Sequence, residues 1–442
     1  MRTCATLSTI VIVSMLAPAA ADDWPQWLGP RRDSVWRETG IVDTFPEQGL
    51  DVKWRKPIEL GYSGPAVADG RVYVTDYVLE SGNVTNVPDG RDDLEGSERV
   101  LCFAAETGEP LWSHSYDRPY KIAYPRGPRC TPLVNAGKVY TLGAEGDLLC
   151  LDANDGTVVW HKALAEEYDV ETPVWGFTGH PLIEGDLLYC LVGGEGSVAV
   201  AFDKNTGREV WSALSAKAPG YCPPTMIEHA GTKQLLIWHT EALNALDPAS
   251  GETFWSVPLK PNYEMSLTAP RLSGSKLFAS GIGHVGALYQ LGETNSTPDV
   301  IWEGNAKNAV YSANSTPFVE GDMIYGADCH VGALIGARLS DGERLWQTFL
   351  PTTGGERRAG HGTAFLVKHE DRFFLFSETG DLVLAKLSPE GYKELGRFHV
   401  LEPTNEAFNR AVVWSHPAFA QRCVFARNDK ELVCVSLAAA SR

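Results

Sequence analysis

The sequence predicts an all-β protein: a single eight-bladed β-propeller built from four-stranded antiparallel blades. Three observations carry this prediction. An internal repeat of 44 to 51 residues ends in tryptophan, eight apolar segments each open a repeat unit, and one strand-like segment stands unpaired before the first unit. Repeats of this length are typical of propeller blades.

The first 21 residues have the layout of a cleavable secretory signal. Arg2 precedes an apolar run from Leu7 to Leu16, and small residues follow up to Ala21. The run is too short to cross a bilayer. We therefore expect residues 1–21 to be a signal peptide, the mature protein to be periplasmic or extracellular, and no later membrane span. Residues 22–50 are expected to form an N-terminal extension, and residues 51–442 the propeller.

The charge balance excludes one class of partner. The chain has 38 Lys and Arg residues against 56 Asp and Glu residues, for a formal net charge of −18. Such a chain repels phosphate backbones, and it has no stripe of basic residues interleaved with aromatics. We therefore do not expect a nucleic acid partner.

Eight cysteines remain after the leader, and they are expected to be structural thiols. Export would permit disulfides. Five of the eight nevertheless lie within apolar strand-like runs, where cysteine usually serves as a small buried apolar residue. These five are Cys102, Cys150, Cys190, Cys423 and Cys434.

Tryptophan marks the outer strand of each unit. Five segments read Gly, three residues, then Trp, and most follow a polar turn such as Asp203-Lys-Asn-Thr206-Gly207. Trp302 and Leu395 extend the series with degraded turns. The predicted outer-strand positions are Trp112, Trp160, Trp211, Trp255, Trp302, Trp346 and Leu395. We expect the tryptophans to be structural, because a propeller must fill the wedge between neighbouring blades.

The innermost strand of each unit has its own signature. Seven units open with Pro before a short apolar strand, and the segment at Thr363-Ala364 fills the remaining place without proline. A turn such as Asp69-Gly70 and a second apolar strand follow, so each unit is a four-stranded meander. The seven prolines are Pro65, Pro132, Pro181, Pro224, Pro270, Pro317 and Pro417.

The last unit lacks an outer strand, and the N-terminus has one to spare. The unit that starts at Pro417 ends without a tryptophan strand, whereas Asp51 to Arg55, with Trp54, precedes the first unit. Pairing this segment onto the last blade closes the ring and removes two exposed sheet edges. Trp54 is therefore expected to be the eighth structural position.

The repeated unit, with its strand opened by proline and its Asp-x-x-Thr-Gly-x-x-x-Trp end, resembles the PQQ-repeat superfamily. This superfamily takes its name from the quinoprotein alcohol dehydrogenases, which bind pyrroloquinoline quinone (PQQ). The segments Asp23-Trp-Pro-Gln-Trp-Leu-Gly-Pro30 and Gly61-Tyr-Ser-Gly-Pro65 are similar to the start of its secreted, non-dehydrogenase members. The resemblance implies that the tryptophans pack between neighbouring blades.

The same resemblance implies a test for the cofactor. Quinoprotein dehydrogenases are expected to have two adjacent cysteines beside PQQ, a tryptophan floor, and Glu, Asn and Asp residues that hold calcium. No two cysteines are adjacent in this chain, and it has no CxxCH haem segment. No cofactor is firmly implied, although PQQ with calcium stays open as an alternative.

Candidate site residues come from the loops that gather around one mouth of the channel. These are the loops that enter the innermost strands and those that join the second strand to the third. Arginine near aromatics at the mouth of an acidic protein favours an anionic or sugar-like ligand. The candidates are Arg126, Arg129, Trp175, His180, Tyr221, Arg357, Arg358, His361, Trp414 and His416. The alternative, that these are ordinary polar loop ends beside a wet channel, stays open.

Three histidines recur with the repeat. His239, His284 and His330 are spaced by 45 and 46 residues, which is only the repeat period, so no metal site is predicted. The first blade carries a polar insertion from Glu80 to Glu98, expected to form a long loop without an equivalent in other blades.

The sequence favours a non-catalytic binding or protein-interaction scaffold outside the cytoplasm, with envelope proteins or a sugar-like or anionic small ligand as partners. One alternative is a PQQ- and calcium-dependent quinoprotein oxidoreductase. The other is a carbohydrate-active or carbohydrate-binding propeller. Function has to be argued from the site, because the fold alone does not supply it.

Overall fold

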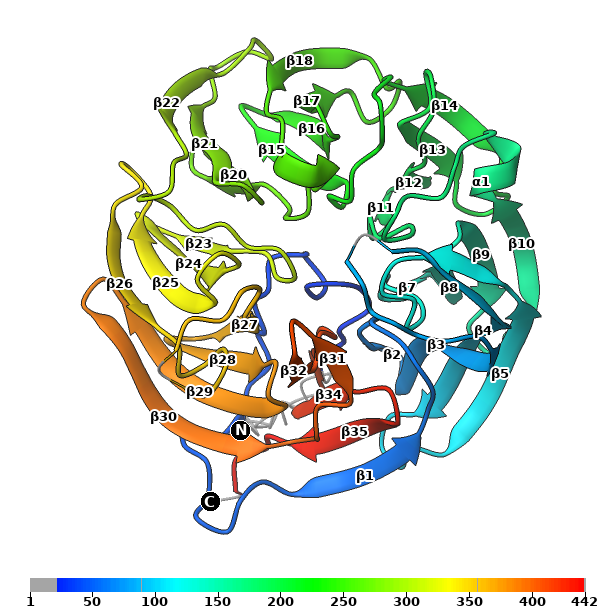
Figure 1. Ribbon diagram of the computed structural model, residues 1–442, viewed down its shortest axis with the longest axis vertical. Helices are drawn as coiled ribbons and strands as arrows, with labels where there is room; N and C mark the ends of the chain where they lie inside the picture. The colour runs from blue at the N-terminus through cyan, green and yellow to red at the C-terminus, as the bar shows by residue number, and fades with distance from the viewer. Residues whose placement is uncertain (1–21, 89, 356, 441–442) are drawn as a thin grey trace, which may run out of the picture.

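The computed structural model describes residues 22–88, 90–355 and 357–440, so the predicted signal peptide lies outside the described residues. Eight four-stranded antiparallel sheets surround a central axis (Figure 1), which confirms the predicted fold class. Their strands are β2 (Ala66–Ala68), β3 (Arg71–Ser81), β4 (Asp92–Ala104) and β5 (Pro110–Asp117) in blade 1; β7 (Leu133–Asn135), β8 (Lys138–Leu142), β9 (Asp147–Asp152) and β10 (Val158–Ala163) in blade 2; β11 (Leu182–Glu184), β12 (Leu187–Leu191), β13 (Ala199–Asp203) and β14 (Glu209–Ala213) in blade 3; β15 (Thr225–His229), β16 (Thr232–Trp238), β17 (Ala242–Leu246) and β18 (Thr253–Pro258) in blade 4; β19 (Arg271–Ser273), β20 (Lys276–Gly281), β21 (Val285–Gln290) and β22 (Asp299–Glu303) in blade 5; β23 (Phe318–Glu320), β24 (Met323–Asp328), β25 (Ala333–Arg338) and β26 (Arg344–Thr348) in blade 6; β27 (Ala364–His369), β28 (Arg372–Ser377), β29 (Asp381–Ser388) and β30 (Gly391–His399) in blade 7; and β33 (Ala418–Ala420), β34 (Cys423–Arg427), β35 (Glu431–Ser436) and β1 (Val52–Pro57) in blade 8.

Outside the blades there are few regular elements. They are β6 (Tyr120–Ile122), which pairs with β4, the hairpin of β31 (Asn405–Ala407) and β32 (Arg410–Val412), the short helix α1 (Leu164–Glu167) and the 3-10 turn η1 (Asn262–Glu264). None of the helices in the described part of the chain has the length and apolar character to cross a membrane.

Each innermost strand begins at the position that the sequence predicts. Seven of them start at the residue after the predicted proline, and β27 starts at Ala364. The hydrophobic clusters lie between consecutive blades. One cluster, for example, joins Tyr73 and Cys102 of blade 1 to Val139 and Leu149 of blade 2. Burial between blades therefore holds the ring together, because each sheet has two apolar faces.

In seven blades the outer strand carries a β-bulge directly before its tryptophan, and this bulge sets the direction in which the indole points. In blade 2, Trp160 pairs with Cys150 while Val158 pairs with Leu151, so Val159 is the extra residue. The indole then reaches the next blade, where Trp160 Nε1 donates to the carbonyl of Lys204 at 3.0 Å. The same indole-to-carbonyl bond recurs from Trp54 to Ala105, Trp112 to Ala153, Trp211 to Pro248, Trp302 to Leu339 and Trp346 to Ser388.

In blade 4 the tryptophan is connected to the next blade by two hydrogen bonds through a glutamine side chain. Trp255 Nε1 donates to Gln234 Oε1 at 3.0 Å, and Gln234 Nε2 donates to Asn295 Oδ1 of blade 5 at 3.1 Å. The turn of blade 5 that would meet Trp255 lacks the repeated Thr-Gly pattern. The glutamine side chain therefore spans the distance that a backbone carbonyl covers elsewhere.

Blade 7 corrects one detail of the sequence prediction. Leu395 is the extra residue of the bulge, and the residue in the tryptophan position is Gly396, which pairs with Leu384. Phe45 of the N-terminal segment occupies the vacant place. An added Cβ on Gly396 would lie 3.1 Å from Phe45 Cδ2, and the Phe45 ring stacks on Phe374 of β28 at 6.5 Å.

The ring closes through the N-terminus, as predicted. Strand β1 pairs with β35, and Trp54 faces Cys434. The buried Arg427 of blade 8 adds a second link, because its guanidinium donates to the carbonyls of Thr75 and Glu59 near blade 1.

Residues 22–50 pass across one end of the channel (Figure 1). Trp24 bridges to Val67 of blade 1, Val35 to Lys368 of blade 7, and the carbonyl of Pro25 accepts from Val134 of blade 2. Arg32 also donates to the carbonyl of Pro181 at the start of blade 3, which lies opposite blade 7. The segment therefore spans the ring and closes that end of the channel.

The prediction of a long loop from Glu80 to Glu98 is wrong. Strand β3 continues to Ser81 and β4 begins at Asp92, so most of the insertion lengthens a hairpin. A cluster with Tyr77, Leu94 and Ile122 at its centre packs beside it. Burial alternates along the start of β4, where Leu94, Gly96 and Glu98 are buried, so this polar segment pairs as a strand with one face covered.

All eight cysteines of the described residues are buried, as is usual for cysteine that serves as a small apolar residue.

The interlock between tryptophan and glycine can be tested with two substitutions in blade 2. Gly156 and Gly137 have nearly the same backbone conformation, with φ of +75° and +73°. A Cβ at Gly156 would lie 2.5 Å from Trp112 Cε3, whereas a Cβ at Gly137 meets nothing within 4 Å. We expect Gly137→Ala to lower the free energy of unfolding by about 1 kcal/mol, and Gly156→Ala to lower it by about 1–3 kcal/mol more. Chemical denaturation measures both values, and equal losses would contradict the interlock.

Candidate functional site

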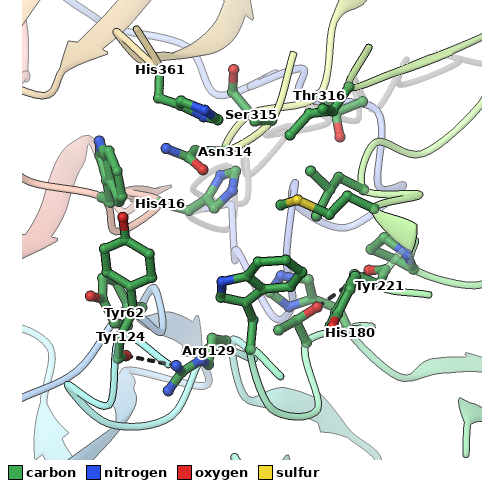
Figure 2. A pocket seen from close by; sticks show the side chains of 18 of the residues that line it. Tyr62, Tyr124, Arg129, His180, Tyr221, Asn314, Ser315, Thr316, His361 and His416 are labelled. Atoms are coloured by element: carbon green, nitrogen blue, oxygen red, sulfur yellow. Dashed lines mark hydrogen bonds between the residues drawn. The ribbon is translucent and has the colours of Figure 1, made fainter. Parts of the chain in front are cut away.

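A cavity of about 680 Å³ lies at the mouth of the channel, opposite the end that residues 22–50 close. Figure 2 shows its side chains arranged around an open centre. Loops from every part of the ring contribute, and most of the lining is aromatic or apolar. The lining residues are Trp27, Tyr62, Pro88, Tyr124, Arg129, Trp175, Thr178, His180, Tyr221, Pro223, Tyr263, Met265, Leu267, Ile282, Ala313, Asn314, Ser315, Thr316, His361, Phe408, Trp414 and His416.

Seven of the ten candidates from the sequence line this cavity: Arg129, Trp175, His180, Tyr221, His361, Trp414 and His416. The other three do not. Arg126 forms an ion pair with Asp429 at 3.1 Å, Arg358 donates to the carbonyl of His330, and Arg357 is exposed. Their presence in the same loops does not bring them to the cavity.

Sequence reasoning missed the residues that complete the cavity, among them Trp27, Tyr62 and Phe408. Trp27 and Tyr62 belong to the two segments that carried the family resemblance, which was the signal available for them. Phe408 lies at the tip of the hairpin β31–β32, which no repeat pattern marks.

The floor of the cavity is built on Trp27 of the N-terminal segment. Its ring stacks on His180 of blade 3 at 4.7 Å with an interplanar angle of 10°. Its Nε1 donates to His416 Nε2 of blade 8 at 3.3 Å. A single indole therefore joins two blades across the axis.

The histidines of the cavity are neutral at pH 7. Burial lowers the pKa of His416 to about 3 and that of His361 to about 4, from an ordinary value of 6.5. Burial also lowers the pKa of His180 well below that value. His180 Nδ1 accepts from the backbone N–H of Thr131 at 3.0 Å and His416 Nε2 accepts from Trp27, so each ring has a fixed hydrogen-bonding role.

Pairs of aromatic side chains form the walls. Trp175 meets Tyr221 edge to face at 5.5 Å, and Phe408 stacks on His361 at 4.6 Å with an interplanar angle of 3°. Trp414 is positioned by its Nε1–H, which donates to the buried Glu378 at 3.2 Å. That carboxylate is also paired with Arg410 at 2.7 Å, so its charge is neutralised behind the wall.

Four of the lining side chains sit on strained backbone. Tyr124, Tyr263, His361 and Phe408 have φ values of 48°, 58°, 59° and 50°, in the left-handed region that bulky residues rarely adopt. Tyr263 is 75% exposed and Phe408 is 45% exposed. Neither side chain is held in this conformation by burial in a core.

The lining does not fit PQQ with calcium. None of the described lining residues is Asp or Glu, so no carboxylate is available there as a calcium ligand. The buried cysteines belong to strands and flanking loops and do not line the cavity. A single arginine would face the three carboxylates of this quinone.

The repeated histidines do not form a metal site in the described structure. His284 and His330 stack at 3.9 Å, but His239 Nδ1 accepts from the backbone N–H of Glu241. No group of three or more His, Cys, Asp or Glu side chains within the described ranges could hold a metal ion.

The depressed histidine pKa values predict how stability depends on pH. Below pH 6.5 the unfolded chain protonates these histidines while the folded chain does not, so the free energy of unfolding falls as the pH drops from 6.5 toward 4. His416→Gln keeps an acceptor for Trp27 without titrating. We expect this variant to take up as much as one proton fewer on unfolding, measured as the slope of unfolding free energy against pH. An unchanged slope would contradict a neutral, buried His416.

Comparison with known proteins places this geometry in a family. A family model described as outer membrane protein assembly factor BamB matches residues 96–348 and 239–442. BamB of Shewanella oneidensis is 22% identical over 353 residues, which are 74% of this chain and 87% of that protein. Lanthanide-dependent methanol dehydrogenase of Methylacidiphilum fumariolicum is 36% identical over 96 residues, but the match spans only 20% of this chain and 15% of that enzyme.

Two solved structures share the fold. The crystal structure of BamB from Moraxella catarrhalis aligns with a TM-score of 0.56 and 15% identity, over 89% of this chain and 99% of that one. Quinohemoprotein alcohol dehydrogenase from Comamonas testosteroni aligns with a TM-score of 0.59 and 13% identity, over 95% and 81% of the two chains. Because the family model matches more than half of the sequence, the chain belongs to the PQQ-like β-propeller family described as outer membrane protein assembly factor BamB.

Proposed function

We propose that this protein is a non-catalytic binding propeller that works outside the cytoplasm and holds a ring-containing ligand in the aromatic cavity at its mouth. One observation carries the proposal. Four lining side chains, Tyr124, Tyr263, His361 and Phe408, are held on left-handed backbone at the site where a ligand would meet them.

Backbone strain of this kind costs about 1–3 kcal/mol per residue and clusters at ligand sites and switches. At Tyr263 glycine would remove the strain, and its ring gains little from burial because it is 75% exposed. A bound ligand supplies the contact that such an exposed ring lacks. The volume, about 680 Å³, lies in the range of sites for small molecules.

The chemistry of the lining supports binding over catalysis. His180 and His416 hold structural hydrogen bonds and are neutral, so neither is poised near pH 7 as a general base. Glu378 lies behind the wall in its pair with Arg410. The scarcity of carboxylates and amides also makes the cavity a poor match for a polyhydroxylated sugar, which leaves the carbohydrate alternative with less support.

Family membership supports a second candidate, a protein-interaction scaffold in outer membrane protein assembly. The family model and the relative from Shewanella oneidensis are both described as outer membrane protein assembly factor BamB, and one of the two solved structures is BamB from Moraxella catarrhalis. On this protein, Val87, Leu350, Tyr263 and Phe408 are large exposed apolar or aromatic residues, and Tyr263 and Phe408 belong to the cavity itself. A side chain of a partner protein would then occupy the cavity in place of a free small molecule. The signal-like sequence of residues 1–21 supports export in both cases.

Matched glycine substitutions test the proposal. Tyr263→Gly removes an exposed ring and relieves strain, so we expect the free energy of unfolding to stay the same or rise by about 1 kcal/mol. Binding of the fluorescent probe N-phenyl-1-naphthylamine should weaken about threefold to tenfold, the value of one lost aromatic contact. Fluorescence titration measures this binding.

Ala230→Gly is the control, because Ala230 has φ of 50° in the β15–β16 turn and does not line the cavity. Its unfolding free energy should change as much as that of Tyr263→Gly, and its affinity for the probe should equal that of the wild-type protein. A wild-type protein that binds no probe, or a Tyr263→Gly variant that binds it as tightly as wild type, would count against the proposal.

A further inference from the structure

The cavity carries one formal charge, and we propose that this charge selects the ligand: a molecule with a flat, apolar ring body and a single anionic group, such as a carboxylate or sulfonate, seated against Arg129. The inference rests on the proposed function, and it adds the chemical class of the ligand. The charge of the cavity lining differs sharply from that of the whole protein.

The protein is strongly acidic, yet the described lining of its cavity is not. The net charge is −18, whereas the lining holds Arg129 and no Asp or Glu. The three lining histidines have lowered pKa values and are neutral at pH 7. At neutral pH the described wall therefore carries a charge of +1, and that charge is on Arg129.

Arg129 is fixed in place without being neutralised. Its Nη1 donates to the carbonyl of Gly127, and its Nη2 donates to the carbonyls of Ala123 at 3.0 Å and Tyr124 at 2.7 Å. These partners orient the guanidinium but carry no formal charge. None of the carboxylates among the described residues forms an ion pair with it.

Its neighbour in sequence shows the contrast. Arg126 lies three residues earlier in the same loop and is paired with the carboxylate of Asp429 at 3.1 Å, outside the cavity. Of the two arginines, only Arg129 keeps both an unneutralised charge and a place in the lining. A partly desolvated cation of this kind is stabilised by an anion more strongly than by water.

The surroundings of Arg129 define the rest of the ligand. The guanidinium lies over the Tyr62 ring, with 5.2 Å from Cζ to the ring centroid, and Tyr124 supplies both a carbonyl and a lining side chain. Figure 2 shows Arg129 beside Tyr62 and Tyr124, with His416 and His361 farther round the opening. An anionic group at Arg129 thus leaves the attached body among aromatic rings.

Cationic ligands are disfavoured by the same geometry. Aromatic rings can hold a quaternary ammonium group, but here the fixed charge has the same sign and no lining carboxylate offsets it. In a ligand with several anionic groups, only one of them could pair with Arg129, and the others would be buried without a counter-charge. The cavity therefore fits a monoanion.

Two fluorescent probes that differ by one group test this inference. The first, 8-anilino-1-naphthalenesulfonate, carries one sulfonate, and the second, N-phenyl-1-naphthylamine, has the same rings without it. Titrated into the full-length mature protein at pH 7, the sulfonate should bind about tenfold to a hundredfold tighter, since a hydrogen bond to a charged group is worth that much. The acidic surface opposes this result, so non-specific attraction does not produce it.

Three variants locate the effect. Arg129→Met should remove the preference for the sulfonate, so that the two probes bind this variant with equal affinity. Arg129→Lys should restore part of the preference, because the charge remains. Arg357→Met is the matched control: it removes one charge from an exposed arginine outside the cavity, and it should behave as wild type.

The outcomes separate this inference from the proposed function. If both probes bind with equal affinity, or Arg129→Met and Arg357→Met weaken the sulfonate equally, the anionic class is overturned while the cavity stands as a binding site. If neither probe binds the wild-type protein, or if Trp175→Ala binds both probes as tightly as wild type, the proposed function fails as well. The wild-type ratio and Arg129→Lys decide the question even if Arg129→Met does not fold.

Discussion

The wedge between neighbouring blades is the constraint on which the rest of this molecule depends. A twisted four-stranded sheet cannot fill that wedge alone, so the outer strands of seven blades insert an indole there and Phe45 fills the place in blade 7. The bulge before Trp160 turns the ring toward blade 3, and its N–H donates to the carbonyl of Lys204. The glycine of the facing turn leaves room for the ring, since a side chain at Gly207 would lie 2.8 Å from it. Because consecutive blades pack tightly against each other, the loops at one end of the ring are held in fixed positions around the channel. The cavity is formed by these loops.

Where the repeat decays, residues from other places take over its role. Gln234 carries the hydrogen bond of Trp255 to blade 5, and Phe45 supplies the ring that blade 7 lacks at Gly396. Phe45 comes from the segment that also brings Trp27 to the cavity floor. The N-terminal segment therefore repairs the weakest blade and shapes the site. Scaffold and site are coupled through one stretch of about thirty residues.

The blades were predictable because their signals are local and repeated. Pro65 and its equivalents open the innermost strands, and the tryptophan spacing gives the number of blades. The site was predictable only in part. Arg126 and Arg129 look alike in sequence, and only the distant Asp429 separates them. Trp27 reaches the floor through contacts with His180 and His416, about 150 and 390 residues away. The left-handed φ at Phe408 could not be predicted from the sequence. The hairpin turn imposes it at a position where Asn or Gly would be expected.

The closure of the ring also has a consequence for the order of assembly. Strand β1 and Trp27 are among the first described residues to be synthesised, yet their partners, β35 and His416, are among the last. Until the C-terminal residues exist, β1 is an unpaired edge and blade 8 cannot begin. Contacts between residues so far apart slow folding and keep apolar edges exposed while the chain waits. At a formal net charge of −18, partly folded chains repel one another, which opposes association through those exposed edges.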